Sequence, residues 1–322
     1  KFSKVGIFSG MNNLTDLSMH PQYATMLGYT QAELESNFAE ELVATATQLN
    51  ISQTELLDKL RWWYNGYRFH LDADRVYNPV SVNNFFDRRE FKNFWFETGT
   101  PSFLINLLKQ EGIYNFTNDP QPEQSFDTFD LENLNVYGLL YQTGYLTIKS
   151  RNAFGLYELD YPNHEVERAM NGYLLEAFGG LRFGGGLPLV FKLETMFWNQ
   201  QLEKAMQVLQ GVFKGIPFQL HETYPEKFFH AALHLLFTYM GIQVQSEVCM
   251  ADGRADAVIE TPTQVYLFEF KLDQSPEVAL QQIHQKQYHQ AFWNKGKPVI
   301  GVGVNFSSTT KNIDDWKAEN FA

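Results

Sequence analysis

The sequence predicts a mainly helical N-terminal region followed by a C-terminal α/β region. Apolar residues recur at helical spacing through residues 21–60, while the segment after Pro217 alternates short apolar runs with turn signals. Between the two regions, residues 179–188 (GGLRFGGGLP) have the composition of a linker. The 322 residues suit two domains better than one.

In the N-terminal region, residues 4–9 (KVGIFS) read as a buried strand. Two Ser/Thr-x-x-Glu patterns, at Thr30 and Ser52, are typical helix starts, and Pro101 favours a third. Residues 136–161 predict a helix followed by a β-hairpin, the outline of a winged-helix-like unit. Further helices are expected over residues 165–178 and 189–211.

The C-terminal region predicts the element order α-β-β-β-α-β. Turn residues separate the first three strands, and Pro276 stands near the first turn of the helix that follows them. The expected elements are a helix over 225–240, strands over 242–250, 254–260 and 264–272, a helix over 276–293, a strand over 298–305 and a polar tail.

Composition and charge exclude several classes of protein. Hydrophobic residues make up 44% of the chain, enough for packed cores, but no apolar stretch is long enough to span a membrane. The single cysteine, Cys249, excludes a disulfide framework and fits a reducing, cytoplasmic location. The chain has no signal peptide and opens at Lys1, which suggests a trimmed or partial protein.

The net charge of −12 argues against a basic protein that binds nucleic acid by charge alone. Residues 218–322 contain 8 Lys and Arg against 12 Asp and Glu, and residues 1–217 contain 17 against 25. Any nucleic acid is therefore expected to meet a local patch, a bound metal or a further part of the protein.

The strongest chemical signal combines Asp256 with Glu269 and Lys271. If the turn between the two strands is centred between Pro262 and Thr263, Asp256 lies opposite Glu269, and Lys271 shares the face of Glu269. Two carboxylates this close repel each other unless a cation or proton intervenes. The set is suited to holding Mg²⁺ beside an ammonium group, as phosphodiester hydrolysis requires. A plain cross-strand salt bridge remains the alternative reading.

Aromatic residues gather where the first helical segments end. Trp62, Trp63, Tyr64 and Tyr67 could stack on bases, but packing within the helical region is the favoured interpretation.

The residues of both regions resemble a known protein family. Residues 253–272 and 279–288 look like the PD-(D/E)XK nuclease domain at the C-terminus of AAA-ATPase-like proteins, most of them bacterial. The fold implied for this part is restriction-endonuclease-like. Other blocks resemble the ATPase-associated region of the same proteins, namely residues 4–18 (KVGIFSGMNNLTDLS), 63–69 (WYNGYRF), 77–82 (YNPVSV), 95–104 (WFETGTPSFL), 139–148 (LLYQTGYLTI) and 161–166 (YPNHEV).

The resemblance assigns roles to individual residues of the C-terminal region. Asp256 and Glu269 match the two metal-binding acids, and the carbonyl of Phe270 would be a further ligand. Lys271 matches the lysine of the motif, and Gln282 matches a supporting glutamine on the following helix.

A first acidic residue is also expected, on the first helix or the first strand. Both Glu226 and Glu247 qualify. A turn at residues 252–253 would pair Glu247 with Val258 and place it on the face of Asp256, which slightly favours Glu247.

The resemblance also implies a division of the chain. The expected parts are a remnant strand of an ATPase-like core (1–19), a helical and winged-helix-like region (20–178), a linker and helix (179–216) and a nuclease-like domain (217–322). Because no G-x-x-x-x-G-K-[ST] motif occurs, ATP binding is expected only in a full-length protein. Homo-oligomers through the ATPase-like region are possible.

These observations predict an enzyme that cleaves nucleic acid, DNA more readily than RNA. It would use Mg²⁺, with Mn²⁺ as a substitute, and would be coupled to an ATPase in the longer protein. Two alternatives stay open: a nuclease fold that has lost activity and serves in binding or regulation, and a fragment of an ATP-dependent motor that moves on nucleic acid.

Overall fold

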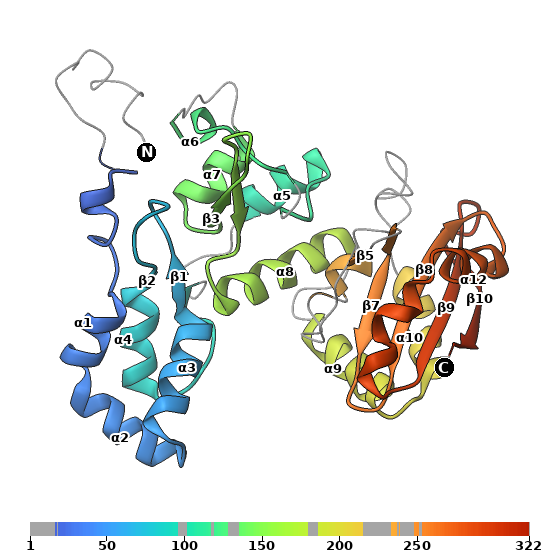
Figure 1. The fold of residues 1–322 in the computed structure, drawn as a ribbon, viewed down its shortest axis with the longest axis horizontal. Coiled ribbons are helices and arrows are strands. Elements are labelled where there is room, and N and C mark those ends of the chain that lie inside the picture. The colour runs from blue at the N-terminus through green and yellow to red at the C-terminus, as the bar shows by residue number, and fades with distance from the viewer. Residues whose placement is uncertain are drawn as a thin grey trace. The chain divides into compact units, whose positions relative to one another are not determined.

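The computed structural model describes residues 17, 19–95, 102–116, 119–127, 135–179, 186–214, 233–236, 238, 248–250 and 253–321. The chain divides into two compact units (Figure 1). Unit 1 comprises residues 1–108 and 115–170, and unit 2 comprises residues 109–114 and 171–322. The strand expected over residues 4–9 lies outside the described residues.

Unit 1 is mainly helical, with two small antiparallel sheets, β1–β2 and β3–β4. Its elements are η2 (Pro21–Tyr23), α1 (Gln31–Asn37), α2 (Ala39–Leu49), α3 (Gln53–Tyr64), β1 (Asn65–Tyr67), β2 (Val76–Tyr77), α4 (Pro79–Arg88), α5 (Ser102–Glu111), α6 (Gln124–Asp127), α7 (Val136–Gln142), β3 (Thr147–Arg151), β4 (Tyr157–Asp160) and α8 (His164–Gly179). The last residues of α5 and of α8 belong to unit 2.

Side chains at the helix starts explain where several of these helices begin. Thr30 and Glu33 form a complete capping box at α1, and the Ser52 hydroxyl accepts a hydrogen bond from the N–H of Glu55 at α3. Asn78 caps α4, whose first residue is Pro79. The helix starts predicted from the two Ser/Thr-x-x-Glu patterns, at Thr30 and Ser52, are therefore confirmed.

The first four helices of unit 1 enclose an aromatic core. Its fully buried residues include Leu60, Tyr64 and Phe85. Tyr67 is also buried, as the packing interpretation of these aromatic residues expected, whereas Trp62 is 58% exposed. The helix and hairpin expected over 136–161 are present as α7 and β3–β4. These elements alone do not establish a winged-helix fold.

Unit 2 is built around a four-stranded sheet with the order β10–β9–β8–β7. The central pair, β8 and β9, is parallel, and both outer pairs are antiparallel. The described elements of the unit after α8 are α9 (Gly186–Trp198), α10 (Leu202–Lys214), β5 (Val248–Met250), β6 (Gly253–Ala255), β7 (Ala257–Glu260), β8 (Val265–Leu272), α12 (Pro276–Gln285), η5 (Tyr288–Lys295), β9 (Val299–Ser307) and β10 (Asn312–Asn320).

Helices contact both faces of this sheet (Figure 1). On one face, Phe268 of β8 contacts Phe197 of α9, and Phe306 of β9 contacts Phe213 of α10. On the other face, Leu267 of β8 belongs to an apolar cluster with residues of α12. Because side chains alternate along a strand, Glu269 and Lys271 share the α12 face with Leu267.

The structure differs from the sequence-based expectation in three elements of unit 2. The polar tail expected after residue 305 contains β10, an edge strand paired with β9. The strand expected over 254–260 is interrupted by a bend at Asp256, which separates β6 from β7. The helix expected over 276–293 ends as α12 at Gln285 and resumes as the 3₁₀ helix η5, because Gln287 adopts a left-handed conformation (φ 51°).

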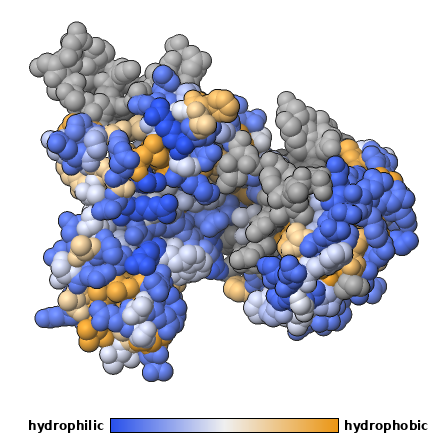
Figure 2. Space-filling view, viewed as in Figure 1, coloured by the Kyte–Doolittle hydropathy of each residue, from blue (hydrophilic) through white to orange (hydrophobic). Residues whose placement is uncertain are grey.

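The segment expected to be a linker and a helix contains α9 and α10, and both pack on the sheet of unit 2. Among the described residues, no helix is long and apolar enough to cross a membrane. Hydrophilic residues predominate on the face seen in Figure 2, and the apolar residues form separate small groups.

Candidate functional site

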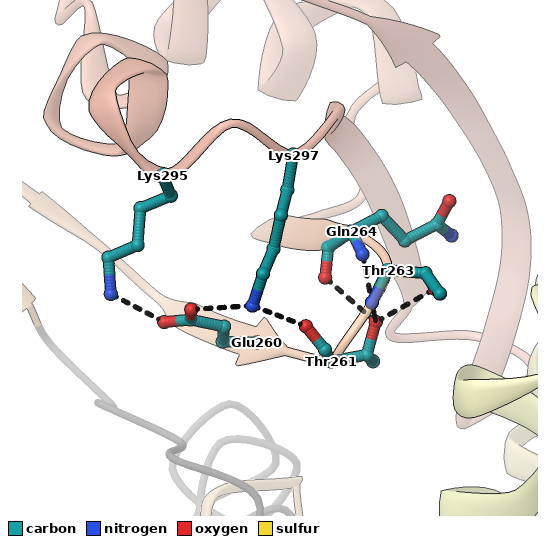
Figure 3. Close-up of polar contacts among 6 residues, drawn as sticks. All are labelled: Glu260, Thr261, Thr263, Gln264, Lys295 and Lys297. Carbon is teal, nitrogen blue, oxygen red and sulfur yellow. Dashed lines mark hydrogen bonds and ion pairs between the residues drawn. The ribbon is translucent and has the colours of Figure 1, made fainter.

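The β7–β8 hairpin sets the geometry of the candidate site. The hydroxyl of Thr261 accepts hydrogen bonds from the N–H groups of Thr263 and Gln264 and so closes the turn (Figure 3). The pairs run from Glu260–Val265 to Ala257–Phe268, which is the register predicted from a turn centred between Pro262 and Thr263. Continued by one residue, this register sets Asp256 opposite Glu269.

Asp256 lies at the bend where β6 ends and β7 begins. Its Oδ2 accepts a hydrogen bond of 2.7 Å from the N–H of Phe270. The carboxylate therefore bonds the main chain of β8 directly after Glu269, which places the two acids side by side. This contact also ties Phe270 to the site, although through its N–H and not through the carbonyl for which a ligand role was expected.

Glu269 is almost completely buried, with 1% of its surface exposed. Its Oε1 lies 2.8 Å from Nζ of Lys271. Burial, reinforced by the charge of Asp256, raises the pKa of Glu269 to about 7 although the ammonium of Lys271 and the main-chain N–H of Asp256 lower it. Its other oxygen, Oε2, is buried and makes no hydrogen bond of normal geometry within the part of the chain that the structure describes.

Lys271 joins the hairpin to α12. Its Nζ donates to Oε1 of Gln282 at 2.8 Å as well as to Glu269. Gly303, which pairs with Glu269 on the neighbouring strand β9, lets α12 approach. A Cβ at that position would lie 2.3 Å from the carbonyl oxygen of Pro276, so a side chain there would displace the helix.

Glu260, at the other end of β7, has a different electrostatic environment from Glu269. Its carboxylate lies 2.7 Å from Nζ of Lys295 and 3.0 Å from Nζ of Lys297 (Figure 3). The hydrogen bond from Lys295, followed by that from Lys297, lowers the pKa of Glu260. The charge of Glu260 is thus balanced by two lysine ammonium groups, whereas Glu269 has one ammonium group and a second carboxylate beside it.

This arrangement fits a hard divalent cation. A buried carboxylate oxygen without a hydrogen bond, next to another carboxylate, is costly unless a proton or a cation compensates it. Carboxylate and carbonyl oxygens are also the ligands that Mg²⁺ prefers. Among the described residues, no group of three or more His, Cys, Asp or Glu side chains is arranged to hold a metal.

The expected first acidic residue cannot be placed, because Glu226 and Glu247 both lie outside the described residues. The preceding hairpin differs from expectation nonetheless. Met250 pairs with Gly253 and Val248 with Ala255, so the turn comes one residue earlier than predicted. The two registers differ by two residues in the pairing, and a shift of two preserves the alternation along a strand, so the hydrophobic pattern does not distinguish them.

The structure thus brings together four of the six side chains expected at the site: Asp256, Glu269, Lys271 and Gln282. Gly303 was not among the residues predicted from the sequence. The alternating glycines of β9, Gly301 and Gly303, were the available signal, since a glycine inside a strand often marks a close approach of another segment.

Comparison with known proteins identifies this region. Residues 224–316 match the family model described as the PD-(D/E)XK nuclease superfamily, so the chain contains a domain of that superfamily. An uncharacterized protein in the vnfD 5′ region of Azotobacter chroococcum mcd 1 is 32% identical over 339 residues. The alignment covers 99% of this chain but 62% of that protein, less than two thirds of its length. No solved structure matches the chain.

Proposed function

We propose that the C-terminal domain hydrolyses phosphodiester bonds of nucleic acid with a divalent metal ion. The observation that carries the proposal is the buried carboxylate of Glu269, which lies beside the carboxylate of Asp256 and whose Oε2 makes no hydrogen bond of normal geometry to the described chain. A folded protein retains such an arrangement at a cost in stability, and metal binding would offset that cost. Asp256, Glu269 and the carbonyl of Phe270 would hold the metal, Mg²⁺ by preference and Mn²⁺ as a substitute.

Lys271 would act beside the metal site. Its ammonium is held by Glu269 and Gln282 at 2.8 Å each, and its side chain is 19% exposed. An ammonium fixed in this way can orient a water molecule and stabilise negative charge on a phosphate oxygen. Gln282 would position it without touching the substrate. When bound, the metal supplies Lewis-acid stabilisation of the charge that develops on the phosphate.

We propose DNA rather than RNA as the substrate. We also propose that an ATPase in a longer protein drives or gates cleavage. The coupling to an ATPase rests on the resemblance of residues 4–18 and of the later blocks to AAA-ATPase-like proteins.

The test compares Glu269→Gln with Glu260→Gln. Both changes neutralise a glutamate of the same hairpin, but Glu260 is paired with two lysines at the other end of β7. Each protein is titrated with Mn²⁺ by calorimetry and incubated with linear, circular and single-stranded DNA and with RNA in Mg²⁺. Lys271→Met and Lys297→Met form a second matched pair.

The proposal expects Glu269→Gln to lose metal binding and cleavage, and Lys271→Met to lose at least about 100-fold in rate while metal binding persists. Glu260→Gln and Lys297→Met should retain both activities. If the unaltered chain binds metal but cleaves no probe, either cleavage needs the ATPase of the longer protein or the domain serves in binding or regulation. If it binds no metal, the catalytic proposal is wrong.

A further inference from the structure

The parallel strands β8 and β9 end side by side at one edge of the sheet, next to Lys271 (Figure 1). Ligands of open α/β sheets bind where parallel strands end. At this edge Lys271 pairs with Asn305 of β9, so the two side chains leave the sheet on the same face, the face that α12 contacts. Because neighbouring strands lie about 4.8 Å apart, Asn305 stands directly beside the lysine of the candidate site.

The amide of Asn305 is held in one orientation. Its Oδ1 accepts a hydrogen bond of 3.0 Å from the main-chain N–H of Gln274. An N–H group only donates, so the oxygen faces Gln274 and the NH₂ group is directed elsewhere. Asp273, in a left-handed conformation (φ 52°), donates from its own N–H to the carbonyl of Phe306 at 2.8 Å. The turn after β8 is thus tied to the end of β9, and the amide of Asn305 is fixed with it.

The NH₂ group of Asn305 supplies donors at this edge. Within the part of the chain that the structure describes, Nδ2 makes no hydrogen bond, and the side chain is partly exposed. The first turn of α12 lies over Gly303, the preceding residue of β9 on this face, where the carbonyl of Pro276 makes its close approach. Asn305 follows at the end of the strand, where a ligand can reach its Nδ2.

The chemistry of this group restricts its partner. An amide Nδ2 only donates, so it meets an acceptor and not a cation. The ammonium of Lys271 beside it favours an acceptor with negative charge. Phosphate oxygens meet both conditions, and asparagine is among the side chains that bind them in complexes with DNA. Asp315 of β10, which pairs with Asn305 on its other side, opposes an anion, but its carboxylate is exposed and screened by salt.

We infer that Asn305 binds the substrate of the proposed nuclease by donating from Nδ2 to a phosphate oxygen beside Lys271. The inference rests on the proposed function, because that function places a phosphodiester group at Lys271. Asn305 adds orientation and not charge, since it aligns the phosphate whose negative charge Lys271 and the metal stabilise. A neutral amide releases no counterion when it binds a phosphate, whereas Lys271 adds to the salt dependence of binding.

The test measures binding separately from cleavage. The full chain is titrated into short fluorescein-labelled DNA and RNA, single-stranded and duplex, in Ca²⁺, which takes the same oxygen ligands as Mg²⁺ in looser geometry. Fluorescence anisotropy is read at several salt concentrations, and electrophoresis checks that each probe stays intact. Cleavage of the same probes in Mg²⁺ tests the proposed function on its own.

Two variants separate the donor of Asn305 from its structural contact. Asn305→Ala removes both the donor and the acceptor, whereas Asn305→Asp keeps an oxygen for the N–H of Gln274 and replaces the NH₂ group by a second oxygen. Asn320→Ala and Asn320→Asp make the same changes near the other end of β9, where Asn320 pairs with Ile300. Thermal unfolding checks that all four variants fold.

We expect both variants of Asn305 to weaken binding about tenfold and both variants of Asn320 to leave it unchanged. Asn305→Ala should keep the salt dependence of the unaltered chain, whereas Lys271→Met should reduce the slope of log K against log salt by about 1. Weaker binding in Asn305→Ala alone would make the contact with Gln274 the only role of Asn305, and weaker binding in Asn305→Asp alone would indicate charge repulsion. Either result, equal affinity of all variants, or no binding of any probe would overturn the inference.

Discussion

Lys271 neutralises only one side of the carboxylate of Glu269. Its Nζ lies 2.8 Å from Oε1, while Oε2 is buried and makes no hydrogen bond of normal geometry to the described chain. Asp256 adds a second negative charge that raises the pKa of Glu269 further. The region thus has a deficit of positive charge, and the predictions for unit 2 follow from that deficit and from the elements that maintain it.

Glu269 should make the stability of the metal-free protein depend on pH. Its pKa is about 7 in the folded chain and near 4.5 when unperturbed, so the folded state holds its proton more tightly. The resulting stabilisation is fully present below pH 4.5 and is lost as pH rises to about 7. We expect a loss on the order of 3 kcal/mol, measured by urea unfolding in EDTA at pH 5 and pH 8.

Glu269→Gln is the control for this pH dependence, because a glutamine does not titrate. The variant should lack this component of the loss, and Mg²⁺ should restore stability at pH 8 to the unaltered protein only. Equal losses in the two proteins between pH 5 and pH 8 would show that other groups cause the dependence.

Asp256 should have separable structural and electrostatic roles. Asp256→Asn keeps an oxygen that can accept the hydrogen bond from the N–H of Phe270, whereas Asp256→Ala leaves that N–H without its acceptor. We expect Asp256→Ala to lower the free energy of unfolding by about 1–3 kcal/mol and Asp256→Asn to lower it by less.

Both variants should nevertheless lose affinity for Mn²⁺ in calorimetric titrations, since both lack the charge of Asp256. Removing that charge should also lower the pKa of Glu269, which carbon-detected NMR titration of the carboxyl group can follow. Mn²⁺ affinity that is unchanged in Asp256→Asn would exclude Asp256 as a ligand.

The register of the site was predictable from sequence, whereas its surroundings were not. The Thr-Pro-Thr turn and the apolar runs on either side of it fixed the alignment of Asp256 with Glu269, which the pairs from Glu260–Val265 to Ala257–Phe268 confirm. Lys271 follows from strand alternation alone. The contact of Gln282 with Lys271 depends on how α12 crosses the sheet, and only the resemblance to a known family indicated it.

The missed strand β10 illustrates why sequence patterns fail at a sheet edge. Most residues of β10 are exposed on either face, and its sequence NIDDWKAEN carries charges at positions that a half-buried strand would fill with apolar residues. Charged edge strands of this kind resist pairing with other chains but lack the alternation by which strands are recognised. Likewise, nothing local to α9 or α10 reveals the sheet on which both helices pack.

Gly303 should be intolerant of a side chain. A Cβ there would meet the main chain of α12 at 2.3 Å, so Gly303→Ala must shift the helix that carries Gln282. We expect a loss of about 1–3 kcal/mol in the free energy of unfolding, together with slower cleavage. Gly211→Ala is the matched control. A Cβ at Gly211 meets nothing within 4 Å, and alanine should stabilise α10 by up to about 1 kcal/mol.

In unit 1, the stability of the fold should depend on the hydrogen bonds that Glu165 accepts and not on its negative charge. It is fully buried, and its Oε1 accepts from the N–H groups of Phe94 and Trp95 while Oε2 accepts from the hydroxyl of Ser81. Burial raises its pKa despite these three hydrogen bonds. Glu165→Ala would leave three buried donors without a partner, and we expect a loss of about 3–5 kcal/mol in urea unfolding at pH 7.

Glu165→Gln separates the two properties. A glutamine keeps one oxygen for the N–H groups of Phe94 and Trp95, and the hydroxyl of Ser81 can rotate to accept from the new amide. We expect this variant to lose no more than about 1 kcal/mol, because it also removes a buried charge. Equal destabilisation of the two variants would instead make the charge the essential property.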